Sequence, residues 1–222
     1  MQAVRARIAA AARSAGREPG EIALLAVSKT FSAAEVRAAH AAGQGEFGEN
    51  YLQEAVEKIA ALSDLPLVWH FIGPIQSNKT RAVAERFDWV HSLARAKIAQ
   101  RLAEARPAAR GPLAVCLQVN VSGESSKSGV APDEVRPLAE AVRALPRLRL
   151  RGLMAVPEPS DDVALQRRRF RGLRLLLEEL NADGFGLDTL SMGMSQDLEA
   201  AVMEGATIVR IGTAIFGERK YA

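Results

Sequence analysis

Short runs of hydrophobic residues alternate along the chain with longer segments in which hydrophobic residues recur every three or four positions. The short runs predict strands, and the longer segments predict helices between them. The eight expected strands lie at residues 22–30, 45–49, 67–73, 88–93, 113–121, 148–156, 188–193 and 207–216. The expected helices lie at residues 33–43, 50–62, 77–86, 95–106, 132–144, 161–181 and 196–204. Several of the strands are hydrophobic at consecutive positions, which is typical of parallel strands that are buried on both faces.

Eight strand and helix units in 222 residues leave about 28 residues for each unit, which is close to what a compact (β/α)8 barrel needs. The main alternative is a doubly wound open sheet, which normally has a glycine-rich turn after its first strand. Here that turn reads VSKTFSA and contains no glycine. We therefore predict an α/β protein with a single (β/α)8 TIM barrel, one domain over residues 1–222.

Residues 1–17 are rich in alanine and arginine and contain no acidic residue. Targeting segments have a similar composition. However, this segment runs directly into the first strand without a linker. We interpret it as an amphipathic helix that belongs to the fold and lies outside the barrel.

The composition indicates a globular protein, because 48% of the residues are hydrophobic and 25% are charged. The formal net charge of +3 is mild and argues against a dedicated nucleic-acid binder. The arginine-rich run at 167–174 is then interpreted as a solvated helix face rather than a nucleic-acid site. No hydrophobic run approaches the ~18 residues of a membrane span. We expect a cytoplasmic protein without a membrane or nucleic-acid partner.

Metal and disulfide chemistry are not predicted. The single cysteine, Cys116, excludes an internal disulfide and a metal site made of cysteines. The three histidines do not have the spacing of metal ligands. His70, within the strand WHFIG, is interpreted as a buried core histidine, and the alternative is a secondary residue of a binding site.

Lys29 follows the hydrophobic run IALLAVS and so stands at the carboxyl end of the first strand. Active sites of (β/α)8 barrels lie at that end of the strands. The lysine either extends to solvent or is an amine whose pKa is lowered by burial, able to form a Schiff base with a carbonyl group. Position alone does not decide between these two interpretations.

Two turns rich in small and hydroxyl residues follow the last two strands, SMGMS at 191–195 and RIGT at 210–213. Loops at these positions hold a phosphate in many barrels, and the helix that follows the first turn would favour an anion. The alternative is two ordinary turns with Ser195 as a helix cap. Arg210 needs a partner inside the barrel, either a carboxylate or a ligand atom. Asn50, after the second strand, is either a helix cap or a ligand contact.

A strand-end lysine together with a phosphate site fits an aldehyde that carries a phosphate. Pyridoxal phosphate is one such ligand, and the sugar phosphate of a Schiff-base aldolase is another. The residues alone do not separate these two ligands.

Motifs along nearly the whole chain resemble those of the pyridoxal phosphate homeostasis proteins, the YggS/PROSC family. They are LLAVSKT (24–30), FGENYLQE (47–54), WHFIGPIQSNK (69–79), VNVSGESSKSG (119–129), RGLMAV (151–156), SMGMSQDLEAAV (191–202) and VRIGTAIFG (209–217). The resemblance implies a barrel like the N-terminal domain of alanine racemase, and pyridoxal 5'-phosphate (PLP) as the cofactor.

The resemblance also implies roles for individual residues. Lys29 would form the internal aldimine with PLP, Arg210 would face the pyridine nitrogen, and Asn50 would line the ring. The implied phosphate site consists of Ser191, Gly212 and Thr213 together with the backbone of Met192, Gly193 and Ser195. Lys127 is implied as a secondary amine for release or transfer of the cofactor.

Finally, the resemblance implies a PLP carrier for vitamin B6 homeostasis without established catalytic turnover. Alanine racemases complete their site with a second domain and a catalytic tyrosine from the partner subunit, and neither Tyr51 nor Tyr221 obviously supplies that group. We therefore assign no catalytic residue. We expect a monomer, with apo forms of PLP-dependent enzymes as candidate partners. The alternative is a small PLP-dependent amino-acid racemase or lyase, which turnover of amino acids would reveal.

Overall fold

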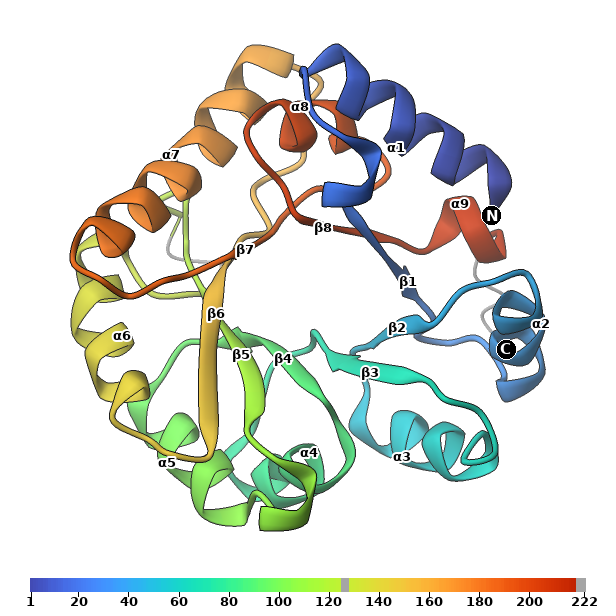
Figure 1. Cartoon of the computed structure of the whole chain (residues 1–222), viewed down its shortest axis with the longest axis vertical. Coiled ribbons are helices and arrows are strands. Elements are labelled where there is room, and N and C mark those ends of the chain that lie inside the picture. Colours follow the sequence, from blue (N-terminus) through green and yellow to red (C-terminus); the bar gives the residue numbers. More distant parts are fainter. Residues whose placement is uncertain (125–127, 219–222) are drawn as a thin grey trace.

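Eight parallel strands form a closed barrel in which each strand pairs with its neighbours in chain order and β8 pairs with β1 (Figure 1). The computed structural model describes residues 1–124 and 128–218. The strands are β1 Ala23–Val27, β2 Glu46–Glu49, β3 Val68–Phe71, β4 Trp89–Leu93, β5 Leu113–Gln118, β6 Leu148–Met154, β7 Thr189–Ser191 and β8 Ile208–Ile211. The predicted (β/α)8 barrel is confirmed.

Helices follow the strands and surround the barrel (Figure 1). They are α1 Gln2–Ser14, α2 Ala33–Ala41, α3 Leu52–Ala61, α4 Thr80–Arg86, α5 Ala96–Ala105, α6 Val135–Arg143, α7 Val163–Ala182, α8 Leu198–Met203 and α9 Thr213–Phe216. Short 3₁₀ helices lie at Pro19–Glu21, Ser77–Lys79, Ala108–Arg110 and Pro132–Glu134.

The prediction of a strand over residues 207–216 is wrong in its second half. The strand ends at Ile211, and Thr213–Phe216 forms the short helix α9. The backbone turns at Gly212, whose carbonyl accepts hydrogen bonds from the N–H groups of Ile215 and Phe216. The spacing of hydrophobic residues over 207–216 does not distinguish a strand from a short helix, because the run is nearly continuous.

Helix α1 packs against α8 on the outside of the barrel (Figure 1). It buries one face, which includes Val4 and Ile8. Arg7 donates hydrogen bonds to both carboxylate oxygens of Glu199 at 2.6 Å and to the carbonyl of Ser195 at 2.7 Å. The first helix is therefore fixed to the loop that follows β7.

The arginine-rich face of α7 is not simply solvated, contrary to the prediction for residues 167–174. Arg167, Arg171 and Arg174 form ion pairs with Glu204, whose side chain is only 2% exposed. Burial opposes ionisation of this carboxyl, but the guanidinium groups hold its pKa below the usual range. These arginines join α7 to the end of α8.

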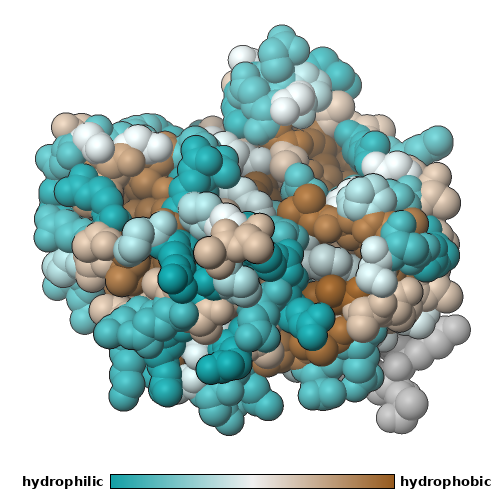
Figure 2. Space-filling model, turned by 60° about the horizontal axis from the view of Figure 1, so that its bottom comes forward, coloured by the Kyte–Doolittle hydropathy of each residue, from teal (hydrophilic) through white to brown (hydrophobic). Residues whose placement is uncertain are grey.

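Hydrophilic residues cover most of the face seen in Figure 2, and hydrophobic residues lie mainly in recesses between them. Across residues 1–124 and 128–218, no helix has the length and hydrophobicity required to cross a membrane. Inside the fold, buried hydrophobic side chains form one core that includes Val36, Phe87, Leu102 and Phe170.

Strands β6 and β7 approach each other closely at Gly152, which is paired in register with Thr189. A Cβ atom on Gly152 would overlap the backbone carbonyl of Thr189. The backbone of Thr189 belongs to a strand of a closed barrel, so it has little freedom to move away from an added Cβ.

We expect Gly152→Ala to destabilise the protein by about 3 kcal/mol, the upper end for overpacking. Gly172→Ala is the matched control, because nothing lies within 4 Å of its added Cβ and alanine favours a helix by about 1 kcal/mol. Urea unfolding of both variants measures the two effects. Equal stability of the two variants would contradict the close approach of β6 and β7.

Candidate functional site

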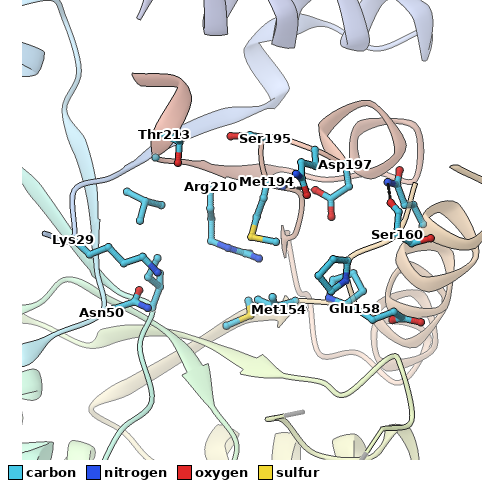
Figure 3. A pocket seen from close by; sticks show the side chains of 18 of the residues that line it. Lys29, Asn50, Met154, Glu158, Ser160, Met194, Ser195, Asp197, Arg210 and Thr213 are labelled. Carbon is cyan, nitrogen blue, oxygen red and sulfur yellow. Dashed lines mark hydrogen bonds between the residues drawn. The ribbon is translucent and has the colours of Figure 1, made fainter. Parts of the chain in front are cut away.

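A cavity of about 520 Å³ lies at the carboxyl-terminal end of the barrel, where the loops after β1, β2, β6, β7 and β8 converge (Figure 3). Of the residues predicted for the site, it is lined by Lys29, Asn50, Ser195, Arg210, Gly212 and Thr213. In Figure 3, Lys29 and Asn50 lie together on one side, Ser195 and Thr213 lie along another, and Arg210 extends between them. Ser191, Met192 and Gly193 are beneath this surface and do not line the cavity.

Lys29 sits in a tight turn directly after β1. The next residue, Thr30, has a φ of 69°, in the left-handed region that a β-branched residue rarely adopts. Its N–H donates to Oε1 of Glu54 at 2.7 Å. On the other side of Lys29, the hydroxyl of Ser28 donates to Oε1 of Glu49 at 2.6 Å. The lysine is therefore held at a fixed position at the mouth of the barrel by hydrogen bonds on both sides.

A buried lysine that the sequence analysis missed connects these two anchors. Lys58 of α3 is 3% exposed and donates to Glu49 at 2.6 Å, to Glu54 at 2.8 Å and to the carbonyl of Ser28 at 2.8 Å. Burial raises the pKa of Glu49, and the ammonium group of Lys58 opposes that rise. The i,i+4 spacing of Glu54 and Lys58 is the one sequence signal for this cluster, but that spacing is common on solvated helices.

Asn50 lines the cavity and does not cap the helix that follows it. The residue that precedes α3 is Tyr51, and no side chain caps that helix. The side-chain oxygen of Asn50 is buried and accepts no hydrogen bond from the described residues. Its backbone is packed against Gly73, where an added Cβ would overlap the carbonyl of Asn50.

Arg210 is 5% exposed and is held entirely by neutral oxygens. Its Nη1 donates to the carbonyl of Ser191 at 2.6 Å and to the hydroxyl of Ser191 at 2.7 Å, and its Nη2 donates to the carbonyl of Ala155 at 2.8 Å. Burial lowers its pKa to about 10, with Asp197 acting in the opposite direction. Arg210 is therefore a cation at neutral pH whose hydrogen-bond partners carry no charge.

The loops after β7 and β8 form the side of the cavity that contains hydroxyl groups. Gly193 has a φ of +94°, and an added Cβ would lie 2.6 Å from the Cβ of Ala201. Asp197, not Ser195, precedes α8, and its Oδ1 accepts a hydrogen bond from the N–H of Met194 at 2.6 Å. An anion at the start of α8 would therefore face a carboxylate, which leaves Ser195, Gly212 and Thr213 as the available donors.

The loop between β6 and α7 lines the rest of the cavity with Glu158, Ser160 and neighbouring prolines, and the sequence analysis did not assign it a role. Burial opposes ionisation of Glu158, but hydrogen bonds from Arg169 and Ser122 hold its pKa at about 2. Gln166 donates to the carbonyl of Ser160 at 2.6 Å. These contacts fix a loop whose sequence, PEPS, carries only turn signals.

His70 does not line the cavity. His70 is buried in the barrel interior, where its Nδ1 lies 2.9 Å from Nε2 of His91. Lys127 lies outside the described residues. Within residues 1–124 and 128–218, no cluster of three or more histidine, cysteine or carboxylate side chains is arranged to hold a metal ion.

The fold and the site together match a known class. Residues 1–220 match the family model described as alanine racemase, N-terminal domain, so the chain belongs to that family. Over 218 residues it is 67% identical to the pyridoxal phosphate homeostasis protein of Pseudomonas aeruginosa, covering 98% of this chain and 94% of that protein. The protein of the same name from Escherichia coli K12 is 53% identical, with 99% and 95% covered.

A solved structure is also similar. PipY of Synechococcus elongatus, solved with PLP bound, superimposes with a TM-score of 0.82 at 39% identity, covering 96% of this chain and 100% of PipY. The resemblance to pyridoxal phosphate homeostasis proteins that the motifs predicted is confirmed.

The buried Lys58 provides a test of the site's framework. Lys58→Met leaves the Glu49 carboxylate buried without a counter-charge, and we expect a loss of about 3 kcal/mol of stability at neutral pH. The loss should shrink at pH 5, because a carboxyl whose folded pKa is raised is stable when protonated and becomes destabilising as the pH rises. Unfolding at both pH values measures this.

Lys97→Met on the exposed surface of α5 is the control and should change stability by less than about 0.5 kcal/mol. A loss for Lys58→Met that is the same at both pH values would contradict an uncompensated carboxylate as its cause.

Proposed function

We propose that this protein binds pyridoxal 5'-phosphate in the cavity at the mouth of the barrel and takes part in homeostasis of that cofactor. One observation carries the proposal: a single cavity is lined by the amine of Lys29, the buried guanidinium of Arg210 and the hydroxyl groups of Ser195 and Thr213. These groups complement an aldehyde, a ring nitrogen and a phosphate. The solved PLP complex of PipY supports the same ligand.

Two further features of the cavity fit this cofactor. The buried side-chain oxygen of Asn50, which the described residues leave without a hydrogen bond, can accept one from a ring substituent. Gly212 lines the cavity beside Thr213, and an added Cβ there would lie 3.1 Å from the carbonyl of Val27. A buried polar atom without a partner is unfavourable unless a ligand satisfies it.

Each residue then has a distinct role. Lys29 holds the aldehyde carbon covalently through Nζ, with loss of water. Arg210 donates a hydrogen bond to the ring nitrogen and keeps that nitrogen unprotonated, because the guanidinium remains charged at neutral pH. When bound, the cofactor supplies an electrophilic carbon and an electron-withdrawing ring. Ser195, Thr213 and the backbone at Gly212 bind the phosphate, with Ser191, Met192 and Gly193 supporting their loop.

We further propose that the protein is a carrier rather than an enzyme. Racemisation needs an acid or base on each face of the substrate carbon. In the described part of the chain, Lys29 is the only amine, imidazole, phenol or thiol that lines the cavity. The two carboxylates there, Glu158 and Asp197, accept hydrogen bonds from Arg169 and from the Met194 N–H.

We propose that the protein acts in the cytoplasm as a monomer and delivers the cofactor to apo-enzymes. Cys116, a free thiol buried in the barrel, is compatible with a reducing compartment.

The covalent link is tested with Lys29→Ala. Incubation of wild-type protein with PLP and borohydride should add one pyridoxyl group at Lys29 and produce a visible absorbance band before reduction. Lys29→Ala should lose both signals, whereas Lys97→Ala should keep both. Peptide mass spectrometry locates the adduct. An unchanged adduct in Lys29→Ala would rule out this lysine.

Turnover separates the carrier from the alternative racemase or lyase. The loaded protein is mixed with L- and D-amino acids, and chirality and keto-acid release are followed. We expect no saturable rate. A saturable rate that disappears in Lys29→Ala would show that the protein is an enzyme.

The phosphate site is tested by comparing two ligands. Thr213→Ala should weaken binding of PLP by about tenfold, because a hydrogen bond to a charged group is lost. Binding of pyridoxal, which has no phosphate, should be unchanged. Fluorescence titration with both ligands measures the difference, and an equal loss for the two ligands would place Thr213 away from the phosphate.

A further inference from the structure

A line of hydrogen-bonded side chains crosses the barrel interior and ends at Arg210. The hydroxyl of Ser191 accepts from Arg210 at 2.7 Å and lies 2.7 Å from Nδ1 of His91. Nε2 of His91 lies 2.9 Å from Nδ1 of His70. Because His91 is on β4 and Ser191 is on β7, which are not neighbours in the barrel, this contact passes through its centre.

The far end of the line is at the opposite mouth of the barrel. Glu46 is the first residue of β2, and its Oε2 lies 3.6 Å from Nε2 of His70. The side chain of Glu46 is 40% exposed. It lines a second cavity of about 560 Å³ together with Arg5 and Gln44. A solvent-accessible carboxylate thus faces the far end of the line, where Nε2 of His70 is buried and has no hydrogen-bond partner among the described residues.

The hydrogen atoms of this line can be assigned from the donors and acceptors of each group together with the negative charge at its far end. Nη1 of Arg210 uses its two hydrogens on the carbonyl and the hydroxyl of Ser191. The hydroxyl keeps one hydrogen and one lone pair, and we assign that hydrogen to the contact with Nδ1 of His91, because the opposite direction would leave an unprotonated Nε2 of His70 facing the Glu46 carboxylate. A neutral His91 therefore carries its hydrogen on Nε2 and donates to Nδ1 of His70.

The hydrogen position of His70 follows from that of His91. With Nδ1 of His70 acting as an acceptor, its hydrogen is on Nε2, the atom that faces Glu46. Burial lowers the pKa of His70 to about 3 and that of His91 well below its ordinary value, so both rings are neutral at physiological pH. In this assignment every donor in the line points away from the cation Arg210, and the last one, Nε2 of His70, faces the Glu46 carboxylate at 3.6 Å without a hydrogen bond.

We propose that Glu46, His70, His91 and Ser191 form an oriented relay whose function is to position Arg210 against the ring nitrogen of the bound cofactor. These four are positioning residues, because none of them lines the cavity. The relay holds the Ser191 hydroxyl as an acceptor for Arg210, so the guanidinium keeps one orientation without an ion pair. This inference rests on the proposed function for the role of Arg210, but the direction of the relay does not.

Neighbouring groups support neutral, fixed rings. Trp89 stacks on His70, with ring centroids 5.4 Å apart and an interplanar angle of 7°. The guanidinium group of Arg151 lies over the Trp89 ring, 4.7 Å from its centroid. The stacked indole fixes the plane of the His70 ring, and burial disfavours its charged form.

The direction of the hydrogen bonds in the relay is tested on cofactor-free protein by ¹⁵N NMR of the histidine rings. We expect His70 and His91 each to show a protonated Nε2 and an unprotonated Nδ1, with His40 on α2 as the internal reference. Glu46→Gln should shift the resonances of both rings, whereas Glu57→Gln on the exposed face of α3 should not. A protonated Nδ1 in either ring of the wild-type protein would overturn the relay as assigned.

The effect on the cofactor is tested by absorbance and affinity. His91→Leu removes the acceptor of the Ser191 hydroxyl and should lower PLP affinity about tenfold and shift the visible band, while His40→Leu changes neither. Ser191→Ala should reproduce the shift, and Glu46→Gln provides a variant whose change lies outside the core. An unchanged band in Glu46→Gln and Ser191→Ala would overturn the positioning role.

The outcomes distinguish this inference from the proposed function. If wild-type protein forms no adduct with PLP, the proposed function fails, and the NMR result still decides the direction of the relay. If the adduct forms at Lys29 with the same band in every relay variant, the proposed function stands and the positioning role is refuted.

Discussion

Closure of the barrel between its first and last strands is the constraint on which the rest of the structure depends. In the β1–β8 pair, Leu25 is in register with Arg210 and Ala26 with Ile211. This pairing brings Lys29, near the start of the chain, to the same cavity as Gly212 and Thr213, near its end. Without closure the amine and the hydroxyl groups would lie at opposite edges of an open sheet. The entropy of closing so long a loop is offset only by the core that the closed barrel buries.

The barrel interior departs from the apolar layers that are usual in this fold. Two histidines, a serine and an arginine occupy its centre, each hydrogen-bonded to the next. Buried polar groups of this kind are tolerated because almost every donor and acceptor is paired, and they fix the rotamers of their neighbours. The ion pair between Lys58 and Glu49 does the same beneath Lys29. The cavity is therefore built on polar contacts that define geometry rather than on hydrophobic packing alone.

The repeating strand and helix units of the fold could be predicted from the sequence alone. Eight hydrophobic runs predicted the barrel, and strand ends predicted that Lys29 and Arg210 would share one mouth. Contacts between distant segments were not predictable in this way. Nothing local shows that His70 meets His91, or that Glu204 is the partner of the α7 arginines. Ser191 illustrates the limit. The sequence groups it with the predicted phosphate turn, but it is the last residue of β7, and its hydroxyl accepts a hydrogen bond from Arg210 inside the barrel.

The attachment of α1 has a consequence for how the protein is made. Arg7 contacts Ser195 and Glu199, and Arg17 donates to the carbonyls of Val202 and Ala206. During synthesis the first helix leaves the ribosome long before these partners have been made, so its hydrophobic face remains exposed to solvent until then. It docks only when α8 has formed, and that docking also fixes the loop carrying Ser195. The cavity is thus completed only after α8 and β8 have been made, and a nascent chain that stalls before α8 would lack both the strand that closes the barrel beside Lys29 and the docked helix that fixes the Ser195 loop.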